Sequence, residues 1–455
     1  MSTFSGLGTA LSSLIAQRQA LDVAGQNVAN ANTVGYTRQR ASLSALPSAN
    51  VPSMFSVNNG AGEGVRVTGI ERLGDVFLDL RLRTQTAGAS YLSARAEAYG
   101  VLEKSLGEPG ETGLASQLAT MWGAWSDLSN TPDKNAARAV VLQDSKAVAD
   151  RIASLYTSVQ TQWTQARTTT AGLVEQVNTT AAGVADLNAR ILEITNAGGT
   201  ANELMDRRDQ LVTQLSSLVG ASTTTRENGQ VDVLVGGNAL VSGKRVHELA
   251  VTGAASFAQA TAGQAVTVVW AERPTQSAGL DGGLGEHAAR YDALATTIAD
   301  QVNTLHGGAV TADGRTTGDF WTFQAGRPAA LGLTVAITSA ADVAVADPTK
   351  GPLDGTVGDA IAALKTSQTG PDAHWSSTVV DLGVRASSAS SRAKVAESAR
   401  ATAEQQQLAA TSVDTDEETV NMLAFQRAYE GAARVLTAVD QMLDVLINKT
   451  GLVGR

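Results

Sequence analysis

The chain has 455 residues, a formal net charge of −10 and no cysteine. This length predicts about two to four domains. The acidic balance argues against nucleic acid or an acidic membrane surface as a partner, because both bind basic faces, and the lack of cysteine excludes disulfides, cysteine-bound metals and thiol catalysis.

The first thirty residues carry apolar side chains at the heptad spacing of a helix that packs along its length. The stripe consists of Phe4, Leu7, Leu11, Leu14, Leu21 and Val28, with Arg18 and Gly25 at the two positions that interrupt it. This spacing predicts one helix from Phe4 to Asn30, roughly 40 Å long at about 1.5 Å per residue. A single helix of this kind needs a partner to bury its stripe.

An asparagine-rich segment follows the predicted first helix. It places Asn27, Asn30 and Asn32 just before Gly35 and Tyr36. Asparagine amides can satisfy the last carbonyls of a helix or bridge to a neighbouring subunit, and Gly35 can adopt the positive φ that a chain reversal needs. We interpret the segment as a helix stop and as the joint between the first helix and the body of the subunit.

The middle of the chain alternates between strand and helix patterns. Residues 51–82 are predicted as strands and turns, and residues 84–218 as alanine-rich helices with breaks at 130–133 and 196–200. Asn202 is the predicted N-cap of the last of these helices, residues 201–219. Strands are predicted again over 220–271, with a hairpin turn at Gly236-Gly237, before helices return at 285–306 and end in a long helix that reaches Ala410.

The C-terminal segment carries the most regular heptad pattern in the chain. The stripe consists of Phe425, Tyr429, Ala432, Leu436, Val439, Leu443 and Leu446. Asp414 or Thr415 can cap this helix, and Glu417 and Glu418 in its first turn would complement the helix dipole. Two interpretations are open: the terminal helices belong to separate domains, or they pair with each other or with copies of themselves.

The element order predicts an α+β fold that is mainly α. We expect paired N- and C-terminal helices of coiled-coil type, formed by residues 1–40 and 412–455. Residues 41–219 and 280–411 would form a bundle of long helices with some strands. Residues 220–279 would form an inserted β-rich module.

The sequence shows no complete catalytic or ligand-binding motif. His247-Glu248 begins like a zinc-protease helix, but Val251 stands where the second histidine would be needed. The glycine-rich stretch that ends at Lys244 lacks two residues of a phosphate loop, and the acids around Glu417 fit a helix start better than a pair of catalytic carboxylates. We predict no catalytic residue, no cofactor and no metal. No secretory signal and no membrane span is expected either.

Residues 20–40 resemble the N-terminal signature of the bacterial flagellar axial proteins, which are the rod, hook and hook-associated proteins. The match is carried by Asn27, Asn30, Asn32, Thr33, Gly35 and Tyr36, and the run Tyr36–Gln39 narrows it to the hook-associated branch. Further blocks resemble that branch in the same order, at residues 60–78, 201–219, 279–294, 302–314 and 413–451. Within them the matching residues include Asn202, Leu204, Asp206, Arg208 and Asp209, and Asp416, Glu417, Glu418, Phe425, Gln426, Tyr429 and Ala432.

This resemblance implies a structural, non-enzymatic role. It implies that copies of the chain form a ring at the hook–filament junction, with the hook protein below and the second hook-associated protein above. The paired terminal helices would form the inner tube, which makes the two apolar stripes subunit-interface residues. The resemblance also implies export through the flagellar type III apparatus to an extracellular position, with a cytoplasmic chaperone on the C-terminal helix before export.

Two other functions are compatible with parts of the sequence. One is a hook or distal-rod protein of the same family, against which the segment 201–219 argues. The other is a secreted enzyme or adhesin with coiled-coil termini.

Overall fold

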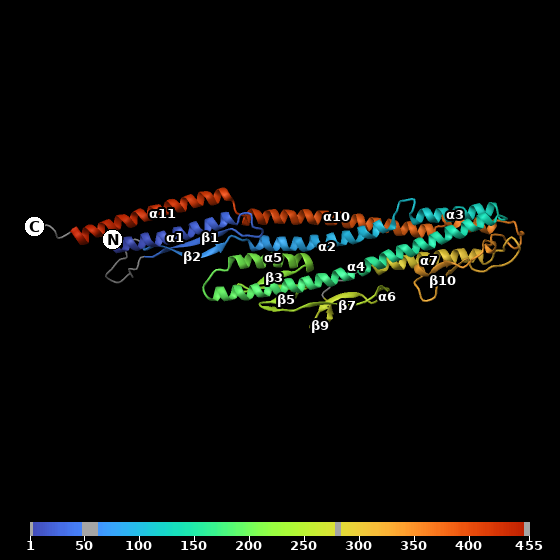
Figure 1. Cartoon of the computed structure of the whole chain (residues 1–455), viewed down its shortest axis with the longest axis horizontal. Coiled ribbons are helices and arrows are strands. Elements are labelled where there is room, and N and C mark those ends of the chain that lie inside the picture. Colours follow the sequence, from blue (N-terminus) through green and yellow to red (C-terminus); the bar gives the residue numbers. More distant parts are fainter. Residues whose placement is uncertain (1–2, 48–61, 278–283, 450–455) are drawn as a thin grey trace, which may run out of the picture. The chain divides into compact units, whose positions relative to one another are not determined.

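The computed structural model describes residues 3–47, 62–277 and 284–449 (Figure 1). The chain divides into two compact units. The first comprises residues 1–88, 179–246 and 397–455, and the second comprises residues 89–178 and 247–396. Both chain termini therefore belong to the first unit.

Helices dominate both units, which confirms the expected mainly α class. The first unit contains α1 (Thr3–Ala29), α5 (Asn202–Val219) and α11 (Thr415–Asp444), which continues as the π-helical η3 (Val445–Lys449). The second contains α3 (Leu114–Asn130), α6 (Phe257–Thr261), α7 (Gly285–His306), α8 (Ala329–Gly332), η1 (Ala340–Asp342), α9 (Thr356–Ala362) and η2 (Ala363–Thr366). Three long helices, α2 (Val76–Leu106), α4 (Asn135–Asn196) and α10 (Pro371–Thr411), contribute residues to both units.

The strands form small antiparallel sheets. In the first unit, β1 (Gln39–Leu46) pairs with β2 (Gly64–Arg72), and a four-stranded sheet holds β3 (Ser222–Thr225), β4 (Val231–Val235), β5 (Asn238–Ser242) and β6 (Arg245–Val246). In the second unit, β7 (Leu249–Gly253), β8 (Val266–Trp270) and β9 (Arg273–Ser277) form one sheet, and β10 (Trp321–Phe323) pairs with β11 (Leu333–Val335). The predicted hairpin is confirmed, because Gly236 and Gly237 join β4 to β5 with φ of 56° and 81°.

Two asparagines of α4 form hydrogen bonds with the backbone of nearby strands, as a neighbouring strand would. Asn178 donates to the Leu249 carbonyl and accepts from the Leu249 N–H, both at 2.9 Å. Asn188, fully buried, donates to the carbonyls of Val231 and Gly243 and accepts from the Val231 N–H. Each side-chain amide thus satisfies backbone groups that an unpaired strand would leave open.

The structure corrects the expected boundary of the first strand region. Residues 76–82, predicted as strand and turn, are the first turns of α2. The Asp75 carboxylate accepts the N–H groups of Phe77 and Leu78 and so caps this helix. The segment 220–279 is rich in strands as expected, but it contributes to both units. The division into a terminal pair, a bundle body and a separate β module stays a prediction.

The core of the second unit gathers around aromatic side chains. Trp122 and Trp125 are buried in it. His306, at the end of α7, is fully buried beside Trp125 and Phe320. Its Nδ1 donates to the Gly318 carbonyl at 2.8 Å, and its Nε2 accepts the Ala344 N–H at 3.0 Å. Only the neutral imidazole can make both bonds.

Among the described residues, no helix has the length and apolar character needed to cross a membrane.

We predict that acid destabilises the second unit. Burial lowers the pKa of His287, His306 and His374 below the ordinary value. In the unfolded chain these side chains take up protons below about pH 6.5, whereas the folded unit keeps them neutral. The unfolded state therefore binds more protons, and the free energy of unfolding falls as the pH drops below about 6.5.

Thermal unfolding measured from about pH 8 to pH 5.5 checks this prediction, with the His306→Gln variant as the comparison. The variant starts from a lower midpoint and loses less of it on acidification. A wild-type midpoint that stays constant across this range would contradict the prediction.

Candidate functional site

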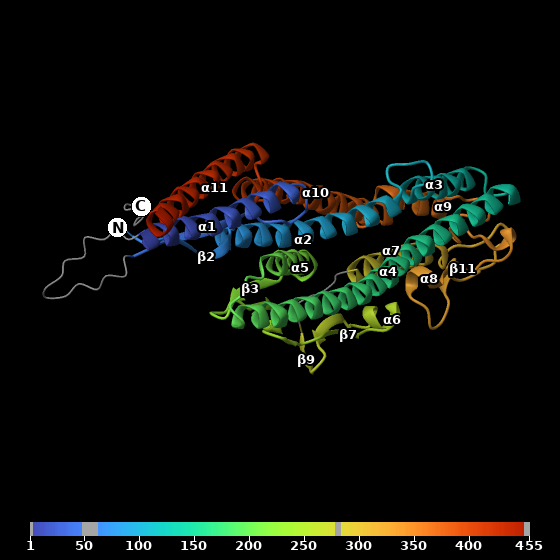
Figure 2. The same ribbon diagram turned by 60° about the vertical axis from the view of Figure 1, so that its left-hand side comes forward.

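The two terminal helices pack against each other within the first unit, side by side and antiparallel (Figures 1 and 2). At one end, a Cβ placed on Gly6 of α1 would lie 3.7 Å from the Val439 side chain of α11. At the other end, Asn27 of α1 donates a hydrogen bond to Glu418 of α11. Of the two interpretations left open by the sequence, the structure therefore shows terminal helices that pair within one chain.

The predicted stripe of α11 largely faces α1. Ala432 and Val439 are buried, and Phe425, Leu436 and Leu443 are half-buried. Tyr429 and Leu446 are exposed. The regular heptad thus marks the face that the helix uses inside its own chain.

The predicted stripe of α1 lies differently. Leu7, Leu14 and Leu21 are half-buried, Leu11 and Val28 are exposed, and the side chain of Phe4 lies outside the described residues. The buried residues of α1 are mostly small ones: Ala10, Ala16, Ala20, Val23 and Ala24. The reason is that α1 is covered by α11 and also by β1 and β2, and small side chains allow this close approach. The alanine spacing 16, 20, 24 was the signal that the sequence analysis overlooked.

Asn27 joins four parts of the first unit. It is buried, and its Nδ2 donates to the Gln39 carbonyl at 2.8 Å and to Glu418 Oε2 at 3.2 Å. Its Oδ1 accepts the Gln39 N–H at 3.0 Å and the Tyr36 hydroxyl at 2.9 Å. Burial and nearby carboxylates raise the pKa of Tyr36 to about 12, so this hydroxyl stays protonated and able to donate. All four hydrogen-bonding positions of the amide are used.

Glu418 has a role that the sequence analysis missed. We expected it to complement the dipole of α11, but it is buried, and its Oε1 accepts Arg38 Nε at 2.7 Å. Arg38 also binds both oxygens of Glu417, which raises the pKa of the arginine. The Arg38 N–H donates to the Thr411 carbonyl at the end of α10. The cap itself is confirmed, since Asp414 accepts the N–H groups of Asp416 and Glu417.

The remaining residues of the joint have local roles. Asn30 donates to the Gln26 carbonyl at 3.0 Å and accepts from the Thr33 hydroxyl, which is the predicted helix stop. Gly35 has φ of +76°, as the reversal requires. Asn32 is exposed. Only the first of the three asparagines therefore bridges distant segments.

The other side of the joint is bonded to α5. The Thr37 N–H donates to Asp206, and Gln210 donates to the Val34 carbonyl. Asn202 is not the N-cap that the sequence predicted, because that position is Ala201. Its buried amide instead donates to Gln39 Oε1 at 2.9 Å and to the Ile70 carbonyl at 3.0 Å. In the sequence, an asparagine that caps a helix looks the same as an asparagine whose amide bonds to a distant segment.

A cluster of charges continues this contact into α2. Arg72 of β2 lies 2.7 Å from Asp206 and 2.9 Å from Asp209, and Arg83 of α2 lies 3.3 Å from Asp209. Burial raises the pKa of Asp206 although Arg72 opposes the shift. Removal of one partner would leave a buried charge uncompensated, so the cluster fixes the position of α5 against β2 and α2.

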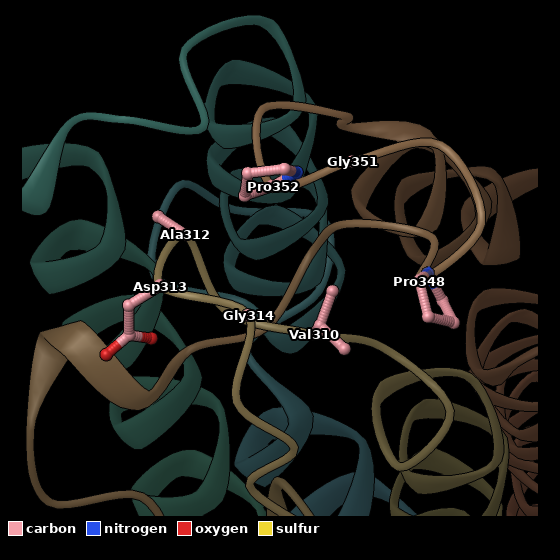
Figure 3. A pocket seen from close by; sticks show the side chains of 7 residues that line it. All are labelled: Val310, Ala312, Asp313, Gly314, Pro348, Gly351 and Pro352. Atoms are coloured by element: carbon pink, nitrogen blue, oxygen red, sulfur yellow. The ribbon is translucent and has the colours of Figure 1, made fainter.

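One pocket of about 320 Å³ lies in the second unit, between the segments 310–314 and 348–352 (Figure 3). Asp313 is the only charged residue that lines it, and its carboxylate already accepts hydrogen bonds from Thr311 and Arg315. Glycine, proline and small apolar residues form the rest of the wall. Among the described residues, no group of three or more His, Asp or Glu side chains is placed to hold a metal. The terminal helices and their joint are therefore the site that the geometry favours.

Comparisons with known proteins also point to the terminal helices. Three family models match: "Flagella basal body rod protein" at residues 7–37, "Flagellar hook-associated protein FlgK helical domain" at 99–321, and "Flagellar basal body rod FlgEFG protein C-terminal" at 404–449. The first and last of these cover most of α1 and all of α11, so the paired termini define the chain as a flagellar axial protein of the rod and hook class.

Full-length relatives narrow the class. Flagellar hook-associated protein 1 of Bacillus subtilis (strain 168) is 31% identical over 524 residues, with 100% of each chain covered. The protein of the same name from Escherichia coli (strain K12) is 28% identical over 375 residues, covering 79% of this chain and 65% of the relative. The chain belongs to the flagellar hook-associated protein 1 family and is a structural component of the bacterial flagellum.

The fold is also shared with a solved structure. The flagellar hook junction protein FlgK from Burkholderia pseudomallei aligns with a TM-score of 0.62 at 14% identity, covering 73% of this chain and 100% of that one. At this identity the comparison shows the fold alone.

We predict that Asn27→Ala lowers the free energy of unfolding by about 3 kcal/mol, because buried groups of Gln39 and Glu418 lose their partner. Denaturant unfolding of the full chain measures the effect. Asn30→Ala is the matched control, since its amide is exposed and local, and it should cost less than about 1 kcal/mol. Equal losses in the two variants would contradict the role given to Asn27.

Proposed function

We propose that the chain forms the junction between the flagellar hook and filament. In this proposal, copies assemble into a ring or short helical array, with the hook protein below and the second hook-associated protein above. The names of the relatives support it, since they are hook-associated proteins and the solved neighbour is described as a hook junction protein. The role is structural and non-catalytic.

The paired terminal helices carry this proposal. After α1 and α11 have packed on each other, large apolar side chains of both helices still face solvent. They include Leu11, Ile15, Val420, Leu423 and Met442, and Ile447 adds to them on η3, which continues α11. Apolar faces of this extent are buried in subunit contacts when a protein assembles. Contacts between unlike faces of identical copies can repeat without closing on themselves, which suits an axial structure.

The same faces need protection before assembly. We propose that the chain leaves the cell through the flagellar type III apparatus and that a cytoplasmic chaperone covers α11 until export. The final location is then extracellular, in the flagellum. The rival role, a hook or distal-rod protein, is separable by a deletion strain: loss of a junction protein leaves hooks in place and releases flagellin monomer, whereas loss of a hook or rod protein removes the hook.

We predict that changing Leu436 and Leu443 together to Asp abolishes filament growth. Both residues are half-buried on the face of α11 that meets α1, so two carboxylates there would separate the helices. The second unit, which contains neither helix, should keep its thermal transition. Swimming and filament length in a complemented deletion strain are the readouts.

The control is Thr437→Asp, which adds a carboxylate at an exposed position between the two leucines. It should support normal filaments. Normal swimming by the variant with both leucines changed would contradict the proposed role of the terminal pair.

A further inference from the structure

The helix α11 carries a second heptad stripe beside the one that faces α1. It consists of Ala424, Ala428, Gly431, Val435, Ala438 and Met442 of α11 and of Val445, the first residue of η3, and these residues follow the spacing 4-3-4-3-4-3. All seven residues are exposed in the described structure. We call this set the outer stripe of α11. A helix with apolar residues on two faces is built to be covered on both of them, and α1 of the same chain covers only one.

The exposed side of α1 carries a matching set at the spacing 3-4-3-4. Its members are Gly8, Leu11, Ile15, Arg18 and Asp22, and all five are exposed. We call this set the outer stripe of α1. Leu11 is 52% exposed and Ile15 is 59% exposed, so two neighbouring large aliphatic side chains form an exposed apolar patch on this helix.

The two outer stripes fit one another when the helices run antiparallel. One register sets Gly8 against Met442, Leu11 against Ala438 and Arg18 against Gly431. In each of these pairs a large side chain meets a small one, which is how antiparallel helices fill the space between them. Ile15 then meets Val435.

Charge favours the same register. Asp22 comes beside Arg427, whose side chain is 80% exposed and whose ion pair with Glu430 is long, at 3.8 Å. Copies related by rotation about an axis along the helices keep the antiparallel direction that α1 and α11 have within one chain. The register is therefore compatible with an axial assembly.

We propose that the outer stripe of α11 binds the outer stripe of α1 from a second copy of this chain. Each α11 is then held between its own α1 and that of a neighbour. This inference rests on the proposed function, because it names the segment that covers the exposed apolar faces of α1 and α11 after assembly. It goes beyond the proposed function by predicting one register between the helices of neighbouring copies.

Because the chain has no cysteine, introduced thiols report this contact directly. One copy carries Leu11→Cys and a second carries Ala438→Cys, and both are produced together in cells that lack the native gene. Mild oxidation of isolated flagella should give a disulfide-linked dimer of the two variants. In the control, the second copy carries Asp440→Cys instead of Ala438→Cys. Asp440 is exposed on another side of α11, so no such dimer should form.

A charge exchange tests the register by a second route. Asp22→Arg and Arg427→Asp should each reduce incorporation of the chain into flagella, and the double variant should restore it. Both positions are exposed, so neither substitution is expected to unfold the chain.

The outcomes separate the two proposals. If both cysteine variants enter flagella and cells swim, but no dimer forms and the double charge variant is no better than the single ones, the register is wrong and the junction role stands. A cross-link from position 438 to a different protein would also overturn the register and assign the outer stripe of α11 to that protein. If neither variant is present in flagella while the wild-type chain is also absent from them, the proposed function itself fails.

Discussion

The arrangement of the first unit depends on the buried hydrogen bonds between Asn27, Glu418 and Arg38. An ionised carboxylate can be buried only when its oxygens have partners, and Glu418 obtains them from α1 and from the chain just after it. The same amide of Asn27 holds the backbone of Gln39 at the start of β1. The start of α11, the end of α1 and the first strand are therefore positioned together, and none of them can shift without leaving a buried polar group unsatisfied.

This constraint changes how the joint is understood. The sequence presents residues 27–36 as a helix stop and joint, and a joint could be loose. In the structure, the joint and the residues just after it are bonded on one side to the terminal helices. On the other side, Val34, Thr37 and Gln39 are bonded to Gln210, Asp206 and Asn202 of α5. The charges of Arg72 and Asp209 extend the contact further. The terminal pair is thus fixed at its joint by directional bonds in a low-dielectric setting, where each unsatisfied group is costly.

Sequence reasoning predicted the regular parts well for physical reasons. Heptad spacing predicted α1 and α11, glycine pairs predicted the β4–β5 hairpin, and Asp414 predicted the start of α11. It failed where a residue's partner is distant in the chain. Glu418 looked like a helix-dipole residue and Asn202 like a cap, because both types are common in the first turn of a helix for local reasons. On α1 the leucine spacing drew attention from the alanines, which are buried because two elements approach that helix at once.

The pairing of α1 and α11 within a single chain, with Gly6 beside Val439, can be tested in solution. The most direct measurement is an intramolecular disulfide between Gly6→Cys and Val439→Cys in dilute, unassembled protein, since no other cysteine is present to compete. If the helices pair within one chain, mild oxidation consumes both thiols and yields a monomer whose mobility under denaturing conditions differs from that of the reduced chain. Retention of both free thiols, or formation of disulfide-linked dimers alone, would contradict this pairing.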